Sequence, residues 1–356
     1  MPAASKRAAS KPAASRLAHG AIPTRRAPRV VALAGGVGGA KLAHGLQARV
    51  GARLTVIVNT ADDLERHGLA IWPDHDTVMY TLAGRDDRER GWGLRDETWT
   101  VIDELARLGE ETWFRLGDRD LATHIARTAR LRGGDRPTDV ALALQRANRL
   151  RATVLPMTDD EVRTKVRTDD GWLDFQDYFV RLRQEPTVHE VRFDGVDSAE
   201  PTPEVREALG DLEPGDLIAV APSNPIVSVG PILAVPGVAE MIAAARDRGV
   251  SIVAVSGIVG GRALKGPADR MLASLGHEAS ALGVARLYRD WIDVFVVDIV
   301  DAALAPAVEA LGVRAVVTDT VMTDDRSRAR LAAEVLAAGR AGGRAAARPA
   351  GRGGGR

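Results

Sequence analysis

The sequence predicts an α/β protein built on a doubly wound, mostly parallel, Rossmann-like sheet. Two observations carry this prediction: short runs rich in valine and isoleucine recur along the chain, and helical patterns lie between most of them. Strands that are apolar on both faces and alternate with helices are typical of parallel sheets covered on both sides. The predicted strands are residues 29–34, 54–59, 153–157, 216–221, 251–256, 293–298 and 314–319.

The helical patterns repeat apolar residues at the spacing of one helix face. The first of them follows the first strand directly, and most of the others separate one strand from the next. The predicted helices are residues 40–49, 97–109, 138–150, 204–210, 238–249, 302–312 and 328–339.

Residues 160–200 interrupt this alternation. The run TKVRTDDGWLDFQDYFVR reads as a hairpin that turns at Asp-Asp-Gly, and VHEVRFDG follows it. We therefore expect a small antiparallel or mixed subdomain, inserted at about residues 155–200.

The overall composition is that of an ordinary globular protein. The 356 residues have a formal net charge of zero, with 45% hydrophobic and 27% charged residues, so no global field favours nucleic acid or an anionic membrane. The sequence has no cysteine, which excludes disulfides, thiolate zinc sites and cysteine nucleophiles. We expect a cytoplasmic protein with no nucleic-acid or membrane partner.

Both ends of the chain differ in composition from the rest. Residues 1–28 are basic and lack acids, and residues 340–356 are rich in alanine, glycine and arginine. We expect both segments to be disordered, which leaves residues 29–339 as one folded domain.

Glycines gather at the end of the first predicted strand, in the stretch LAGGVGGAKL. Glycines at a strand-to-helix junction let backbone N–H groups approach an anion, and the helix dipole adds positive potential. Lys41 adds a charge in the first helical turn. The stretch matches neither the dinucleotide fingerprint nor the Walker A loop. It predicts a phosphate cradle made by Gly35, Gly36, Gly38 and Gly39; the alternative is a tight turn without a ligand.

Polar residues follow the second predicted strand in the stretch NTADD. Asn59, Asp62 and Asp63 lie at the strand tip, where an acid can bind a ribose or a magnesium ion. Asp74 and Asp76 come shortly afterwards, just before a helical pattern. Either of the last two can be a helix N-cap. Four aspartates at two neighbouring loops favour Mg²⁺ beside substrate phosphates.

Further candidates lie in later loops. Trp92 belongs to a cluster of tryptophans that can form a slot for a flat aromatic ligand. Arg119 lies at a predicted helix start, where it has no capping role and can bind a phosphate or carboxylate. Ser223 and Asn224 follow another predicted strand. Two interpretations stay open for them: contact with a nucleotide, or capping of a turn.

Together these stretches resemble the 2-phospho-L-lactate transferase family, whose actinobacterial branch is described as phosphoenolpyruvate transferase. The resemblance covers about residues 29–335 and rests on ordered blocks. They are LAGGVGGAKL, VNTADD, PDHDTVMYTLAG, RGWGLRDETW, LGDRDLATHIART, LPMTDD, DFQDYFV, APSNPIVSVGPILAVPG, SGIVGGRALKGPADRM and VMTDD.

The resemblance implies a Mg²⁺-dependent reaction in the synthesis of the deazaflavin coenzyme F-420. The ribityl 5′-hydroxyl of the deazaflavin Fo attacks a guanosine-diphosphate-linked enolpyruvate or lactate, and GMP leaves. The resemblance thus implies small-molecule partners, and it is compatible with a homodimer.

The resemblance also implies roles for individual residues. Asp76 contacts Fo as a catalytic residue or ligates the metal with Asp62, and Arg119 binds the donor or the developing charge. Thr77 and Trp92 are further candidates for contact with the deazaflavin. The donor is held by the glycine loop with Lys41, Asn59, Ser223 and Asn224.

Two alternatives come from other classes of protein. A non-catalytic regulatory protein that binds nucleotide-sugars would share the glycine-loop core, but it would not need RGWGLRDETW, LGDRDLATH or DFQDYFV. A Rossmann oxidoreductase is disfavoured because Lys41 stands where the third glycine of the dinucleotide fingerprint is required.

Overall fold

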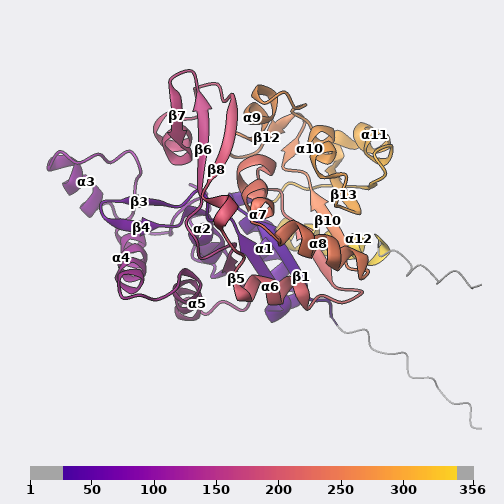
Figure 1. Cartoon of the computed structure of the whole chain (residues 1–356), viewed down its shortest axis with the longest axis horizontal. Helices are drawn as coiled ribbons and strands as arrows, with labels where there is room; N and C mark the ends of the chain where they lie inside the picture. Colours follow the sequence, from indigo (N-terminus) through magenta and orange to yellow (C-terminus); the bar gives the residue numbers. More distant parts are fainter. Residues whose placement is uncertain (1–26, 343–356) are drawn as a thin grey trace, which may run out of the picture.

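The computed structural model describes residues 27–342, and a seven-stranded parallel sheet with helices on both faces forms its centre (Figure 1). Each predicted strand is present, and its bounds lie within one residue of those expected. The α/β prediction is therefore confirmed. In spatial order the strands are β14 (Arg314–Thr318), β13 (Val294–Asp298), β10 (Ser251–Val255), β9 (Leu217–Val220), β1 (Val30–Ala34), β2 (Leu54–Val58) and β5 (Thr153–Pro156).

The strand order reverses at β1. The chain runs from β1 to β2 and β5 on one side, and then returns to place β9 on the other side of β1. Leu33 of β1 pairs with both Ile57 of β2 and Val220 of β9, so the three strands end at the same level. Ligands of open α/β sheets bind at such a switch point, beyond the carboxyl ends of the strands.

Alternation along β1 builds two separate cores. Val30, Ala32 and Ala34 pack toward helices α1, α2 and α12, whereas Val31 and Leu33 pack toward α6, α8 and α10. Because successive side chains of a strand point to opposite faces, every residue of β1 is buried.

Each helix predicted from the sequence is present, with one exception. The helix expected over residues 302–312 is two pieces, a 3₁₀ turn (Ile299–Leu304) and α11 (Ala305–Glu309), because Pro306 favours the first turn of a new helix. The α-helices are α1 (Gly36–Val50), α2 (Pro73–Leu82), α3 (Thr100–Arg107), α4 (Asp118–Arg132), α5 (Pro137–Ala147), α6 (Pro203–Gly210), α7 (Gly230–Ala234), α8 (Val238–Asp247), α9 (Ala268–Ser274), α10 (Ala281–Tyr288), α11 and α12 (Asp325–Gly342).

Small antiparallel sheets are formed by segments that follow strands of the main sheet. The predicted antiparallel insertion is a three-stranded sheet of β7 (Gly171–Asp174), β6 (Arg163–Thr168) and β8 (Glu190–Asp194), with the expected turn before Gly171. Two hairpins were not predicted from the sequence. They are β3 (Leu64–Arg66) with β4 (Leu69–Ile71), and β11 (Ile258–Val259) with β12 (Arg262–Ala263).

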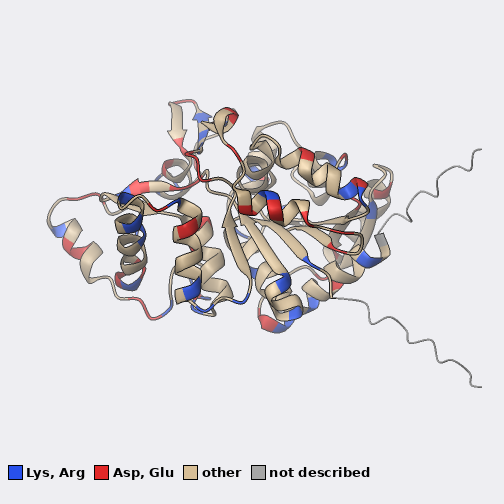
Figure 2. Cartoon of the chain, turned by 60° about the horizontal axis from the view of Figure 1, so that its bottom comes forward, with Lys and Arg blue, Asp and Glu red and all other residues tan. Residues whose placement is uncertain are grey.

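The predicted disordered ends, residues 1–28 and 340–356, fall largely outside the described residues. Where the second overlaps them, α12 continues to Gly342, since alanine and arginine are good helix formers. Among the described residues, no single helix is long and apolar enough to cross a membrane. The pair Pro225–Ala234 and Val238–Asp247 reaches that length together, but it is bent by 85°. Basic and acidic residues are interspersed over the elements (Figure 2).

Candidate active site

The glycine loop and the loop after β9 meet at the switch point. The Gly35 N–H donates to Ser223 Oγ at 3.1 Å, and the Ser223 hydroxyl donates to the Gly35 carbonyl at 2.8 Å. A Cβ on Gly38 would lie 2.3 Å from the Pro222 carbonyl oxygen, and one on Gly39 would lie 2.8 Å from Ser223 Oγ. These glycines are therefore required for the close approach of two loops, whether or not a phosphate binds beside them.

This packing makes a testable prediction for Gly38. Gly38→Ala should lower the free energy of unfolding by about 1–3 kcal/mol, because the new methyl group meets a backbone carbonyl that cannot rotate away. Urea denaturation measures the change. Gly210→Ala is the matched control, since a Cβ there meets nothing within 4 Å. Equal stability of the two variants would contradict the packing argument.

Asp74 connects the glycine loop to the tip of β2. One of its oxygens accepts from the Gly36 N–H at 2.7 Å, and the other accepts from Asn59 Nδ2 at 3.1 Å. Burial raises the pKa of Asp74 to about 6, although both hydrogen bonds oppose that shift. Asp74 thus does not cap its own helix, whose N-cap is Trp72; it binds the first turn of α1 instead. Gly36 has φ of 62°, a left-handed conformation that glycine adopts without strain.

Asp62 is buried and Asp63 is half-buried, near Asp74 and Asp76. Burial, with the neighbouring Asp74, raises the pKa of Asp62 well above its usual range. Burial likewise raises the pKa of Asp63. The positive charges of Arg163 and Arg127 oppose this rise, and the negative charges of Asp76 and Asp74 add to it. One oxygen each of Asp62, Asp63 and Asp76 is buried without a hydrogen-bond partner in the described chain. Carboxylate oxygens are ligands that hard divalent cations prefer.

Asp76 faces a second group of buried side chains. Its Oδ1 accepts from Arg127 and lies 3.4 Å from His75 Nδ1. Burial raises the pKa of Asp76, but Arg127, His75 and His124 outweigh it and bring the pKa to about 2. Asp76 is therefore a permanent carboxylate at neutral pH.

Asp76, Asp120 and His124 have ligand atoms within 4.8 Å of one another, which is also a spacing that suits a metal ion. The guanidinium of Arg127 already lies in this group, donating to Asp76 Oδ1 and to His124 Nδ1, the latter at 2.9 Å. The guanidinium of Arg127 thus already compensates the charge of these acids.

The remaining predicted residues lie apart from this carboxylate group. Lys41 donates to the Met322 carbonyl at 3.0 Å, and burial lowers its pKa together with the nearby Arg328. Asn224 turns its Oδ1 onto the Ile226 N–H at 2.9 Å, as the capped-turn alternative expected. Thr77 is half-buried on α2.

Arg119 and Trp92 lie near the N-termini of α4 and α3, where each helix is capped by an acid that belongs to the neighbouring segment. Glu97 accepts from the Arg119 and Asp120 N–H groups and so caps α4, whereas Asp118 accepts from the Thr100 N–H and so caps α3. The Arg119 side chain is exposed and reaches the Arg95 carbonyl at 3.4 Å. Trp92, 42% exposed, packs edge-on against Trp99. Neither residue touches Asp76, so their roles toward a ligand stay predictions.

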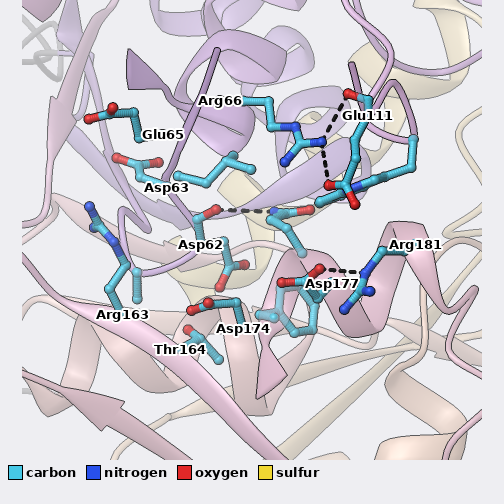
Figure 3. A pocket seen from close by; sticks show the side chains of 15 residues that line it. Asp62, Asp63, Glu65, Arg66, Glu111, Arg163, Thr164, Asp174, Asp177 and Arg181 are labelled. Atoms are coloured by element: carbon cyan, nitrogen blue, oxygen red, sulfur yellow. Dashed lines mark hydrogen bonds and ion pairs between the residues drawn. The ribbon is translucent and has the colours of Figure 1, made fainter. Parts of the chain in front are cut away.

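A cavity of about 420 Å³ opens beside Asp62 and Asp63 (Figure 3). Figure 3 shows the Arg66–Glu111 pair on one side of Asp62, and Thr164 and Asp174 on the other. The lining residues are Ala61, Asp62, Asp63, Leu64, Glu65, Arg66, Glu111, Trp113, Arg163, Thr164, Asp174, Phe175, Gln176, Asp177 and Arg181.

Known proteins resemble this chain over nearly its whole described length. The family model of the 2-phospho-L-lactate transferase CofD matches residues 30–337. The chain belongs to the CofD family. The chain is 45% identical over 315 residues to a phosphoenolpyruvate transferase of Streptomyces griseus, covering 86% of this chain and 97% of that protein. It is 40% identical over 310 residues to a 2-phospho-L-lactate transferase of Methanosarcina mazei, covering 87% and 100%.

The predicted family and enzyme class are thus confirmed: this CofD-family chain is a transferase. A crystal structure of a UPF0052 family protein from Bacillus halodurans has the same fold, with a TM-score of 0.58 and 16% identity, covering 87% of this chain and 100% of that one. The Rossmann oxidoreductase alternative has no support in these similarities.

The cavity of this CofD-family chain contains residues that the sequence did not single out. Thr164 donates its N–H to the Ala61 carbonyl at 2.7 Å, and Gln176 donates to the Asp62 carbonyl at 3.1 Å. These bonds attach the antiparallel insertion to the turn that carries Asp62. The block DFQDYFV was the available signal, since it contains Phe175, Gln176 and Asp177.

Proposed function

We propose that this transferase moves a phosphoenolpyruvyl or 2-phospholactyl group to the ribityl 5′-hydroxyl of Fo, as a step of coenzyme F-420 synthesis. The donor is the corresponding guanosine-diphosphate-linked acid. The hydroxyl oxygen forms a bond to the phosphorus that bears the acid, the bond to the second phosphate breaks, and GMP leaves with the electron pair. The hydroxyl loses its proton.

One observation supports this reaction best: aspartates of two neighbouring loops lie at the switch point, and two of them, Asp62 and Asp63, line a cavity of charged, polar and aromatic groups. Asp62, Asp63 and Asp76 each keep an unpartnered buried oxygen, and carboxylate oxygens are the kind of ligand that Mg²⁺ prefers. Magnesium, when bound, neutralises charge on the phosphates. Phosphoryl transfer needs mainly positioning and charge neutralisation, so a strong general base is not required.

Different parts of the chain have different roles in this proposal. The cavity orients a polyol chain through its polar wall, and Trp113 and Phe175 offer surfaces for a ring. The loops of Gly35 and Ser223 hold the donor at the switch point. We assign Asp76, which Arg127 holds, to the metal or to the hydroxyl.

The deciding experiment incubates the protein with Fo, Mg²⁺ and each guanosine-diphosphate-linked acid in turn: enolpyruvate, lactate and glycerate. Mass spectrometry is expected to show a phosphodiester of Fo and one equivalent of GMP with one of these donors. Absence of product with all three would refute the proposed reaction. Quenching of Fo fluorescence without any product would favour a binding protein instead.

Removing the metal is a separate prediction. Treatment with EDTA should reduce GMP release below a tenth of its rate, and added Mg²⁺ should restore it, because the charge on the phosphates is otherwise uncompensated. Full activity in EDTA would contradict the proposed role of the metal. The proposed donor and acceptor would still stand.

A further inference from the structure

Among the residues that the structure describes, two aromatic ones line the cavity beside Asp62, and the fold already uses their surfaces to different extents. Phe175 is 6% exposed, and its ring lies parallel to that of Phe179 with the two centres 5.5 Å apart. Trp113 is half-buried, so more of its ring is left for a ligand. Trp113 is therefore the larger aromatic surface that the cavity wall offers.

Arg66 of β3 holds Trp113 from the neighbouring hairpin. Its Nη2 donates to both the carbonyl and the Oε2 of Glu111, each at 2.9 Å. Its guanidinium carbon lies over the Trp113 ring, 4.8 Å from the centre, a distance at which a cation is attracted to the face of an indole. Trp113 Nε1 in turn donates to Glu111 Oε2 at 3.4 Å. The three side chains thus bind one another across two segments, β3 and the loop between α3 and α4.

Phe114, the next residue of this loop, anchors the backbone of Trp113. It packs against a small apolar cluster that contains Ile71 and Leu121. It also packs edge-on against Trp113, with the ring centres 5.9 Å apart. Removing the guanidinium of Arg66 therefore leaves the loop attached, but it removes the charged group that lies over the face of the indole.

The position of Trp113 indicates the shape of a suitable ligand. The Arg66–Glu111 pair lies on one side of Asp62 (Figure 3), and Trp113 contacts both members of that pair. Asp62 and Thr164 supply polar groups to the same cavity. This wall suits a molecule that has a flat ring at one end and hydroxyl groups at the other.

We propose that the flat ring of the acceptor packs on Trp113, and that Arg66 is a positioning residue, which fixes the plane of that indole in the cavity wall. This inference rests on the proposed function, because it takes Fo as the acceptor. It gives to Trp113 the ring contact that the family resemblance suggested for Trp92. Trp92 packs edge-on against Trp99 and is not among the described residues that line the cavity.

The test measures binding of Fo without any donor, by the fluorescence anisotropy of Fo as the full chain is titrated into it. W113L is expected to raise the Kd for Fo at least tenfold, because the stacking of a flat ring on an aromatic side chain is lost. W113F should stay within about threefold of the wild type, since phenylalanine restores a flat surface. R66M should raise the Kd about fivefold, and R66K about twofold because it restores a cation over the ring.

R192M is the matched control for R66M. Arg192 lies over the Trp172 ring, 4.1 Å from its centre, so it forms the same kind of pair on the antiparallel insertion. Neither residue is among the described residues that line the cavity, and the Kd of R192M should equal that of the wild type.

Turnover separates positioning from a general loss of structure. R66M should raise the KM for Fo and leave kcat at saturating Fo within about twofold of the wild type, because the ring contact is the same in the ground state and in the transition state. A fall in kcat with an unchanged KM would overturn the positioning role.

The variants also decide between Trp113 and Trp92. A wild-type Kd in W113L would overturn the ring contact, and weaker binding in W92L instead would return that contact to Trp92. If W113L does not fold, labelling with 5-fluorotryptophan decides: the ¹⁹F resonance of Trp113, assigned by its loss in W113F, should shift when Fo binds. An unmoved resonance would overturn the contact.

For Arg66, a wild-type Kd in R66M would overturn the positioning role, and R66K decides in the same way if R66M does not fold. All of these negative results would leave the proposed reaction standing. If Fo binds only after the donor, the KM for Fo replaces the Kd in each comparison. A wild type that neither binds Fo nor forms product would remove the proposed function, and this inference with it.

Discussion

Asp62→Asn should lower the transfer rate by about a hundredfold, the scale of losing one group that stabilises the transition state electrostatically. The same substitution should raise the free energy of unfolding of the metal-free protein by about 0.5–2 kcal/mol. The reason is that Asp62 is buried next to Asp74, and burial together with this neighbour raises its pKa. An amide of the same shape removes the charge that the fold opposes.

Turnover by GMP release and urea denaturation in EDTA measure the two effects. Mg²⁺ should stabilise the wild type and have little effect on Asp62→Asn. A variant that is both less active and less stable would indicate that Asp62 has a mainly structural role. Asp103→Asn is a suitable control, since Asp103 lies on the exposed face of α3 and pairs with Arg115 at 3.2 Å.

Asp76→Asn should also lose activity, by at least tenfold, but its effect on stability should have the opposite sign. Asp76 balances the buried charge of Arg127, so neutralising it leaves that guanidinium without a counter-ion. We expect the free energy of unfolding to fall by about 3 kcal/mol, the lower end for breaking a buried ion pair.

The double variant Asp76→Asn/Arg127→Met separates the two effects. It removes both charges, so it should recover part of the lost stability and none of the activity. Wild-type turnover in folded Asp76→Asn would refute the role of Asp76. Stability unchanged from the wild type would refute its role as counter-ion.

The sequence predicts the sheet well because its strands are buried on both faces. Val30 to Ala34 are apolar at every position, and such a run has few other stable environments in an α/β chain. The rule that ligands bind at strand tips then brings together Gly35, Asp62 and Ser223, which come from three different loops. Family motifs gave the enzyme class.

The partners of each side chain could not be predicted in the same way. Asp74 and Asp118 both precede helical patterns, yet each binds the first turn of a different helix, because loop geometry brings that helix closer. Arg127 lies in the arginine-rich stretch DRDLATHIARTARLR, where nothing local distinguishes a buried arginine from the exposed Arg130. Only the packing of α4 against β4 and α2 does so.

Asp74 has a consequence for competition by common anions. Its carboxylate already occupies the Gly36 N–H, the first free donor of α1. The negative charge of Asp74 therefore offsets part of the positive potential at this helix N-terminus. Inorganic phosphate or sulfate gains less binding free energy there than at a helix N-terminus without an acid. A diphosphate ester accompanied by a divalent cation can offset the repulsion from Asp74, and a free anion cannot. We therefore expect free phosphate and sulfate to compete only weakly with the donor at this loop.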